Sequence, residues 1–223
     1  MSASLVGSEM CIRDRFLNAD DDLLCTCSCR QSKVLYGLSE NADVRAENIK
    51  TESAAKQTCD IISGSRRMHV SIPAYGRHMV YAALEGAAVG IKFGLSDDEI
   101  IRGIAAYKTV GRRANVIDTG YITIIDDCYN ANPDSVKCAI DSMAEGGGRK
   151  VCILGDMLEM GTERAARHAD IGRYAVQKGV ELLLCVGEMS KNTCRAADGI
   201  AALHFDNNAQ LISQLPQLIN KGD

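Results

Sequence analysis

The fold is decided by residues 122–156, which read ITIIDDCYNANPDSVKCAIDSMAEGGGRKVCILGD. The apolar run 122–126 predicts a β-strand. A helix follows it, because Asn132 is a good N-cap and Pro133 suits the first helical position. Its apolar face recurs at helical spacing in Val136, Ala139, Ile140 and Met143. Three glycines, 146–148, end this helix, and residues 150–154 form a second strand.

The same rhythm continues to the end of the chain. It predicts helices over 162–178, 188–197 and 207–220, and strands over 181–186 and 202–205. Unbroken apolar strands that alternate with helices are typical of a parallel sheet covered on both faces. We therefore predict an α/β fold in which four strands, near Ile122, Val151, Leu183 and Leu203, share one parallel sheet.

The preceding part of the chain has a different pattern. Residues 16–71 are rich in short strands, expected over 34–37, 43–49, 59–63 and 68–72. A long helical run follows from Gly76, and Ser96 with Glu99 forms a capping box for the next helix. Gly111 and Arg112 mark a plausible boundary. We assign no function to residues 1–15, which we expect to be a leader or a translated sequencing artefact.

Charge and hydropathy exclude two classes of partner. The 223 residues carry 25 Lys plus Arg and 29 Asp plus Glu, a formal charge of −4, with no block of like charge. Because nucleic-acid binding needs clustered basic residues, we expect no nucleic-acid partner. The longest apolar runs are far shorter than the about 20 residues of a membrane-spanning helix, so we expect no membrane embedding.

The ten cysteines do not indicate a secreted disulfide framework. No secretory signal is visible, and Cys152 and Cys185 lie inside apolar runs, where a thiol behaves as a small hydrophobe. This predicts a cytoplasmic protein with reduced thiols. Cys25, Cys27 and Cys29 lack the usual zinc spacing, so a polar strand or loop is favoured there and we predict no metal ligands.

Two strand-end loops carry the candidate site residues, since ligands of open α/β sheets bind beyond the carboxyl ends of the strands. The first, residues 126–132, offers two carboxylates, a phenol and two carboxamides at a helix N-terminus; an Asx-rich turn with a helix cap is the alternative. The second, residues 154–161, presents acids between glycines; a tight turn with solvated acids is the alternative.

Three other residues stand out. His78 lies at an expected helix start and His168 within an expected helix, where a lone histidine is more often a packing residue than a catalyst. Arg112 has the guanidinium needed to bind a phosphate in bidentate fashion. The chain contains no G-x-x-x-x-G-K-[ST] phosphate-binding loop.

Several motifs resemble the Mur ligases. They are DDCYNANPDSVK at 126–137 and LGDMLEMG at 154–161, followed by His168, Gly172 and Gly187. Upstream, LNADD at 17–21, GRHMVYAALEGAAVG at 76–90 and GRRANVIDTGYITIIDD at 111–127 are similar to the same family. The resemblance extends from about Phe16 to Asp223.

The resemblance implies a domain organisation. Residues 16–110 correspond to the end of the family's central ATPase domain, and residues 111–223 to most of its Rossmann-like C-terminal domain. The expected protein is a fragment at both ends, without the family's N-terminal domain, its phosphate-binding loop or its magnesium-holding carbamylated lysine. We therefore expect no catalytic residue within this chain, and we expect it to be a monomer.

The resemblance also implies an activity, ATP-dependent amide formation between UDP-N-acetylmuramoyl-tripeptide and D-alanyl-D-alanine through an acyl phosphate, in the synthesis of peptidoglycan precursors. ATP and Mg²⁺ are the implied cofactors, bound mainly by the part of the enzyme outside this chain. Nucleotide contacts are implied for His78, Arg112, Asp126, Asp127, Tyr129, Asn130 and Asn132. The D-alanyl-D-alanine loops are implied to include Gly155, Asp156, Glu159 and His168.

One departure and two alternatives remain. Where family members often carry the Asn that holds adenine, this chain has Met79 and Ala82, so that contact is absent. The first alternative interpretation is that the chain is part of another ligase of the superfamily, such as a folylpolyglutamate synthase. The second is that it is a noncatalytic module that binds nucleotide or peptide.

Overall fold

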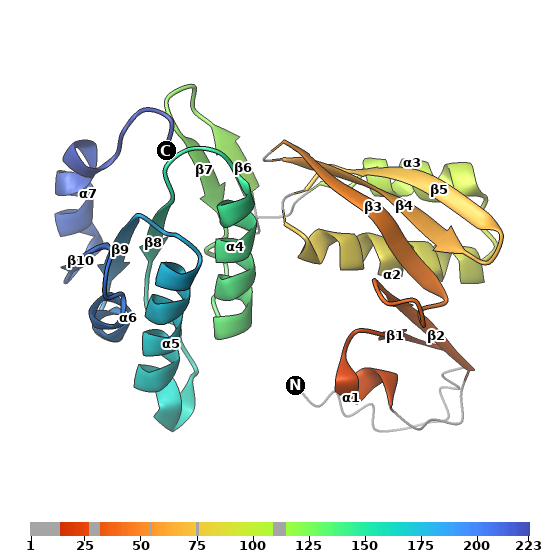
Figure 1. Cartoon of the computed structure of the whole chain (residues 1–223), viewed down its shortest axis with the longest axis horizontal. Helices are drawn as coiled ribbons and strands as arrows, with labels where there is room; N and C mark the ends of the chain where they lie inside the picture. The colour runs from red at the N-terminus through yellow and green to blue at the C-terminus, as the bar shows by residue number, and fades with distance from the viewer. Residues whose placement is uncertain (1–13, 27–31, 54, 75, 109–114) are drawn as a thin grey trace. The chain divides into compact units, whose positions relative to one another are not determined.

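The computed structural model describes residues 14–26, 32–53, 55–74, 76–108 and 115–223 (Figure 1). Contacts divide it into two compact units. The first comprises residues up to 50, 58–72 and 80–106, and the second comprises 51–57, 73–79 and 107–223. Arg112, Cys27 and Cys29 lie outside the described residues. No helix among the described residues is long and apolar enough to cross a membrane.

The first unit is built around a five-stranded sheet of order β1-β2-β3-β4-β5. Its strands are β1 (Asp14–Asn18), β2 (Ser32–Gly37), β3 (Val44–Ser53), β4 (Lys56–Ser63) and β5 (Arg66–Ile72). The sequence predicted the last four, with shorter bounds, and missed β1 and the short helix α1 (Asp22–Cys25). Asp14 and Arg15 belong to β1, although we expected a leader up to residue 15.

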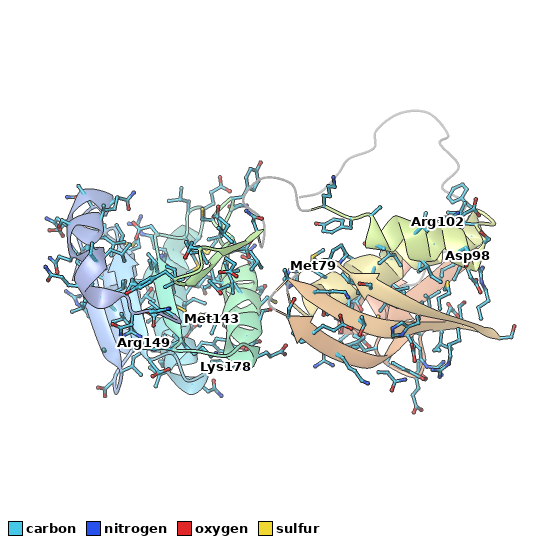
Figure 2. The ribbon with its side chains drawn as sticks, turned by 90° about the horizontal axis from the view of Figure 1, so that it is seen from above. Met79, Asp98, Arg102, Met143, Arg149 and Lys178 are labelled. Atoms are coloured by element: carbon cyan, nitrogen blue, oxygen red, sulfur yellow. The ribbon has the colours of Figure 1, made fainter. Side chains whose placement is uncertain are left out.

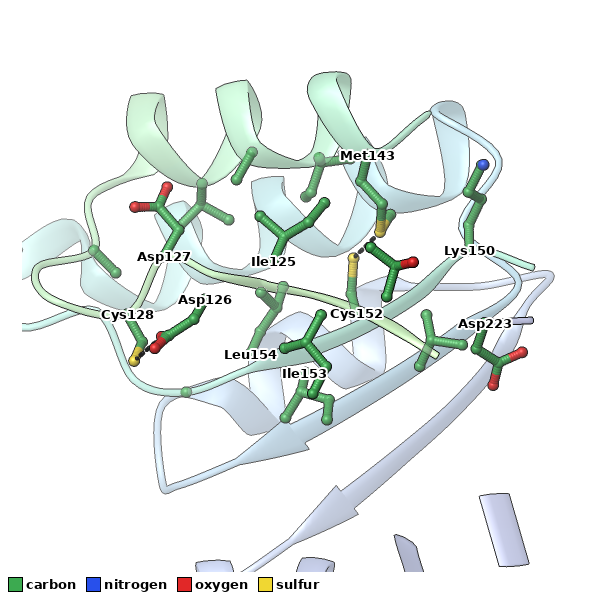
Figure 3. A pocket seen from close by; sticks show the side chains of 18 of the residues that line it. Ile125, Asp126, Asp127, Cys128, Met143, Lys150, Cys152, Ile153, Leu154 and Asp223 are labelled. Carbon is green, nitrogen blue, oxygen red and sulfur yellow. Dashed lines mark hydrogen bonds between the residues drawn. The ribbon is translucent and has the colours of Figure 1, made fainter. Parts of the chain in front are cut away.

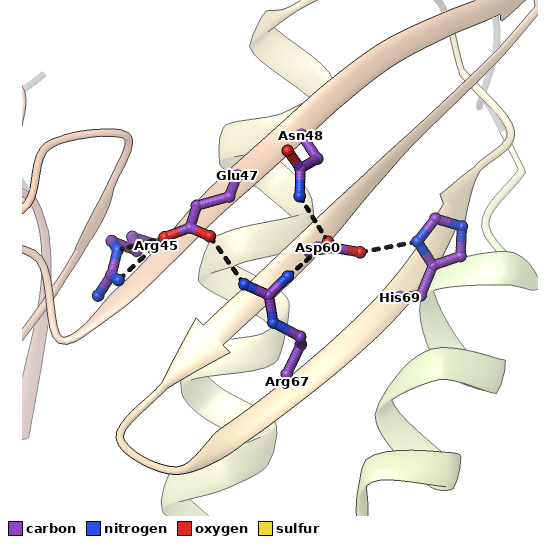
Figure 4. Close-up of polar contacts among 6 residues, drawn as sticks. All are labelled: Arg45, Glu47, Asn48, Asp60, Arg67 and His69. Atoms are coloured by element: carbon purple, nitrogen blue, oxygen red, sulfur yellow. Dashed lines mark hydrogen bonds and ion pairs between the residues drawn. The ribbon is translucent and has the colours of Figure 1, made fainter.

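Most of β4 is buried, and Asp60 is a charged residue within it. Cys59 and Ile61 are fully buried, while Asp60 between them accepts hydrogen bonds from Asn48, Arg67 and His69 at 2.8 Å each (Figure 4). Burial raises the pKa of the Cys59 thiol to about 11. The hydrogen bonds from Asn48 and His69 lower the pKa of Asp60.

Two helices complete this part of the chain, α2 (His78–Lys92) and α3 (Asp97–Ala105). The predicted capping box is confirmed, because Ser96 and Glu99 each bond the other's backbone N–H. The acids of the first turn of α3, including Asp98, and Arg102 in its last turn complement the helix dipole (Figure 2).

The second unit contains the predicted strand–helix alternation. Its three-stranded sheet has the order β10-β9-β8, from β8 (Val151–Leu154), β9 (Leu182–Val186) and β10 (Ala201–Phe205), all parallel. The helices are α4 (Pro133–Glu145), α5 (Arg164–Gln177) after a 3₁₀ turn, η1 (Gly161–Glu163), α6 (Ser190–Ala196) and α7 (Asn208–Leu218).

Both faces of this sheet are covered, which explains the unbroken apolar run of β9. Leu183 and Cys185 pack into a core with residues of α4 and α5, while Leu182 and Leu184 pack with Leu211 of α7 on the other face. Cys152 and Cys185 are buried and free, as predicted, and burial raises the pKa of Cys152 to about 12.

The prediction that all four strands share one sheet is wrong for the first of them. Among the described residues, β7 (Thr123–Asp126) pairs antiparallel with β6 (Asn115–Asp118) in a separate two-stranded sheet. The sequence analysis missed β6. A tight turn makes this hairpin possible: the Thr119 hydroxyl oxygen accepts from the Ile122 N–H at 2.9 Å, and the Thr119 N–H donates to the Ile122 carbonyl.

Candidate functional site

A cavity of about 860 Å³ lies between β7, β8 and α4 in the second unit (Figure 3). Apolar side chains such as Ile125, Ile153 and Met143 line its middle. Polar groups gather at its two ends, with Asp126 and Asp127 at one and Lys150 and Asp223 at the other. The candidate site is the first of these ends, where the carboxyl ends of β7 and β8 lie.

The loop after β7, residues 127–132, is here called the β7 loop. The Cys128 thiol donates to Asp126 Oδ1 at 2.9 Å, and Tyr129 is 66% exposed. Asn132 caps α4: its Oδ1 accepts from the Ser135 N–H at 2.9 Å, and the Ser135 hydroxyl oxygen accepts from the Asn132 N–H. The predicted cap is therefore confirmed. It commits the Asn132 carboxamide oxygen to the helix.

The loop after β8, residues 155–160, is here called the β8 loop. Met157 is buried, and its N–H donates to His168 Nε2 at 2.9 Å. Asp156 Oδ1 accepts from the Ser190 N–H at 2.8 Å. The tip of this loop faces outward, since Leu158 is 74% exposed and Glu159 is exposed with a φ of 60°.

A contact with the loop after β9 was missed by sequence analysis, which named Gly187 only among the residues that resemble the Mur ligases. Gly187 has a φ of 111°, and a Cβ there would lie 2.6 Å from Asp156 Oδ1. Glycine is thus required both by the backbone conformation and by the closeness of the carboxylate. The signal available in the sequence was a glycine directly after an apolar strand.

The opposite end of the cavity carries a second polar group that sequence reasoning did not find. Arg149 forms two hydrogen bonds to the Asp223 carboxylate, at 2.9 and 2.6 Å, and donates to the Leu218 carbonyl. These bonds lower the pKa of Asp223. Residues 149 and 223 are far apart in the chain, and no local pattern connects them.

His78 is the first residue of α2. Its Nδ1 is buried and has no hydrogen-bond partner within the described part of the chain. Burial lowers the pKa of His78, which favours a neutral ring.

The structure brings together part of the predicted set. Asp126, Asp127, Gly155, Asp156 and His168 all line the cavity, whereas Tyr129, Asn130 and Glu159 lie on the exposed parts of the two loops. Within the described ranges, no group of three or more His, Cys, Asp or Glu side chains is arranged to hold a metal ion.

Comparison with known proteins identifies the family of this chain. Residues 112–223 match the family model described as Mur ligase, glutamate ligase domain. The chain belongs to the Mur ligase family. It is 34% identical, over 209 residues, to the UDP-N-acetylmuramoyl-tripeptide–D-alanyl-D-alanine ligase of Escherichia coli (strain K12), covering 91% of this chain and 45% of that protein.

Solved structures share the Mur ligase fold. MurF from Acinetobacter baumannii superposes with a TM-score of 0.84 at 24% identity, covering 92% of this chain and 45% of that one. MurF ligase from Thermotoga maritima, in complex with ADP, gives 0.72 at 19% identity, covering 86% and 44%. The chain thus spans less than half the length of these relatives.

Proposed function

We propose that this chain is part of an ATP-dependent ligase that joins D-alanyl-D-alanine to UDP-N-acetylmuramoyl-tripeptide. The relative from Escherichia coli carries that name and matches 91% of the chain. The observation that carries the proposal is the meeting of the β7 and β8 loops at one cavity end, with carboxylates and a helix N-terminus. We place the enzyme in the cytoplasm as a monomer without nucleic-acid partners; the buried free thiols and the charge of −4 support this location and partner class.

The β7 loop is proposed to bind the nucleotide. Carboxylates such as that of Asp127 are acceptors for ribose hydroxyls, and they repel phosphates unless a cation lies between them. The phosphates are instead proposed to meet Arg112 and the Mg²⁺ ion, which offsets their charge during transfer. We assign Mg²⁺ no ligand in this chain.

The reaction proposed for the whole enzyme has two steps. The terminal carboxylate of the UDP-linked tripeptide takes the γ-phosphoryl group of ATP and becomes an acyl phosphate. The amine of D-alanyl-D-alanine then attacks the acyl carbon, an amide bond forms, and phosphate leaves. The role proposed for the β8 loop is to bind the dipeptide, with the Glu159 carboxylate available to the ammonium group before it loses its proton.

Calorimetric titration of the 223-residue chain with ATP and magnesium tests the nucleotide site. Asp127→Ala is expected to weaken binding about tenfold, since it removes an ionised acceptor from the site. Asp134→Ala is the matched control, because Asp134 is exposed on the first turn of α4. Equal affinity in both variants would remove the β7 loop from the proposed nucleotide site.

A ligation assay tests the activity. With all substrates supplied, the chain alone is expected to release no phosphate above a no-protein control, because a phosphate-binding loop with its lysine is missing and one lost donor already costs about 10²–10³ in rate. Substrate-dependent release would overturn the proposed dependence on residues outside this chain.

A further inference from the structure

His168 lies in the second turn of α5 and is completely buried. Its Nε2 faces the N–H of Met157 at 2.9 Å, and its Nδ1 faces the Arg164 carbonyl at 2.7 Å. Since a nitrogen that accepts a hydrogen bond carries no proton, the proton of the ring is on Nδ1, which donates to the helix carbonyl. Both ring nitrogens are thus used by the backbone, so neither is available to a ligand.

The contact fixes one point of the β8 loop, and Asp156 fixes another. Met157 is held by its N–H and by burial of its side chain, and Asp156 is held by Ser190. The two residues that follow, Leu158 and Glu159, are therefore directed outward. Glu159 adopts a left-handed backbone, which is unfavourable for a non-glycine residue and persists because its surroundings impose it.

We propose that His168 is a positioning residue: it holds the β8 loop in the conformation that presents Leu158 and Glu159 to the dipeptide. The link to the dipeptide rests on the proposed function, whereas the link between His168 and the loop does not. His168 touches no substrate in this proposal and acts through the Met157 N–H.

Two substitutions separate the two contacts of the ring. Glutamine carries an oxygen at the same bond distance from Cα as Nε2, so His168→Gln retains an acceptor for the Met157 N–H. Asparagine carries a nitrogen at the same number of bonds from Cα as Nδ1, so His168→Asn retains the donor to the Arg164 carbonyl. It loses the acceptor for the Met157 N–H of the β8 loop. Both variants fill the core with a polar side chain, so each controls for the general cost of replacing the histidine.

The experiment uses ¹⁵N-labelled 223-residue chain and three readouts. Nitrogen shifts of His168 report the proton on Nδ1, amide hydrogen exchange reports the Met157 N–H, and titration with D-alanyl-D-alanine reports binding. We expect Met157 exchange at least tenfold faster in His168→Asn than in His168→Gln, and dipeptide affinity about tenfold weaker in His168→Asn with near wild-type affinity in His168→Gln.

The outcomes are distinct. Equal Met157 exchange in the two variants, or a proton on Nε2, would overturn the positioning role. Loss of Met157 protection in His168→Asn together with unchanged dipeptide affinity would overturn the link to the substrate. If the wild-type chain binds no dipeptide, the assignment of the dipeptide to the β8 loop fails, and the exchange data still decide whether His168 holds the loop.

Discussion

The β7 loop and the β8 loop leave strands of two different sheets at one end of the same cavity, yet they are held differently. The β8 loop is tied to α5 through Met157 and His168, and to the N-terminus of α6 through Asp156 and Ser190. The β7 loop is tied at its last residue, where Asn132 caps α4, and exposes Tyr129 in its middle. One wall of the site is thus held by contacts with two helices, while the other ends in a helix cap and carries an exposed tyrosine.

The largest expected effect comes from breaking the support of the β8 loop at Gly187. Gly187→Ala is expected to destabilise the second unit by about 3 kcal/mol, because alanine is strained at this φ and its Cβ would meet the Asp156 carboxylate. Urea unfolding followed on the amide signals of β9 measures the change.

Gly199→Ala is the matched control for this substitution. Gly199 has a φ of 94° but no atom within 4 Å of a built Cβ, so it isolates the backbone strain, about 1 kcal/mol. Equal losses in the two variants would show that the closeness of the Asp156 carboxylate adds nothing to the backbone strain at Gly187.

Much of this framework could be predicted from the sequence because its signals are local. The Asn132 cap with Pro133, the glycines at 146–148 and the apolar runs of β8 and β9 each lie within a few residues of the element that they define. Two candidate loops were likewise found from their places after apolar strands.

The rest depends on contacts between distant residues. Nothing near His168 in the chain shows that its ring bonds Met157 eleven positions earlier, so the sequence left it as a candidate substrate residue. The separate β6–β7 hairpin was missed because β6 has four residues and a weak apolar pattern, and because which edge of β7 is paired is a tertiary question.

A second test concerns the helices that carry the two loops, α4 and α5. The Tyr174 hydroxyl donates to the Asp141 carboxylate at 2.7 Å, and Lys178 pairs with the same group at 2.6 Å. Tyr174→Phe is expected to cost about 1.5 kcal/mol at pH 7, as a hydrogen bond to a charged group. Urea unfolding measures the loss.

The pH dependence of this contact has a definite sign. Burial raises the pKa of Asp141, but hydrogen bonds from Lys178 and Tyr174 outweigh it and leave the pKa lowered from 3.8. The stabilisation is therefore present above that value and is lost as the pH falls through the lower folded pKa. A difference between wild type and Tyr174→Phe that does not shrink in acid would contradict this account.

A smaller effect is expected at the Asn132 cap, where the β7 loop ends. Asn132→Ala should destabilise the second unit by about 1 kcal/mol, the usual cost of a lost N-cap. Asn130→Ala, at an exposed position of the same loop, should leave stability unchanged within about 0.5 kcal/mol. A loss of stability in Asn130→Ala as large as that in Asn132→Ala would contradict this account, because a second residue of the β7 loop would then stabilise the second unit.

The smallest effect is expected at the protein surface beside the β8 loop. Lys191, in the first turn of α6, donates a hydrogen bond of 2.7 Å to the carboxylate of Glu188, three residues earlier in the chain. This hydrogen bond lowers the pKa of Glu188. Lys191→Met should therefore raise the pKa of Glu188, which NMR titration of its side chain measures. Because the folded pKa is lowered, the pair stabilises the protein above the unfolded pKa and loses that contribution as the pH falls. The stabilities of wild type and Lys191→Met should therefore converge in acid.

The same variant tests whether the ion pair helps to hold the β8 loop. Ser190, the residue that holds Asp156, lies between Glu188 and Lys191 in the chain. If buried contacts hold the β8 loop, the Met157 exchange rate should stay unchanged in Lys191→Met. Faster exchange of the Met157 N–H would mean that this exposed ion pair also helps to hold the β8 loop.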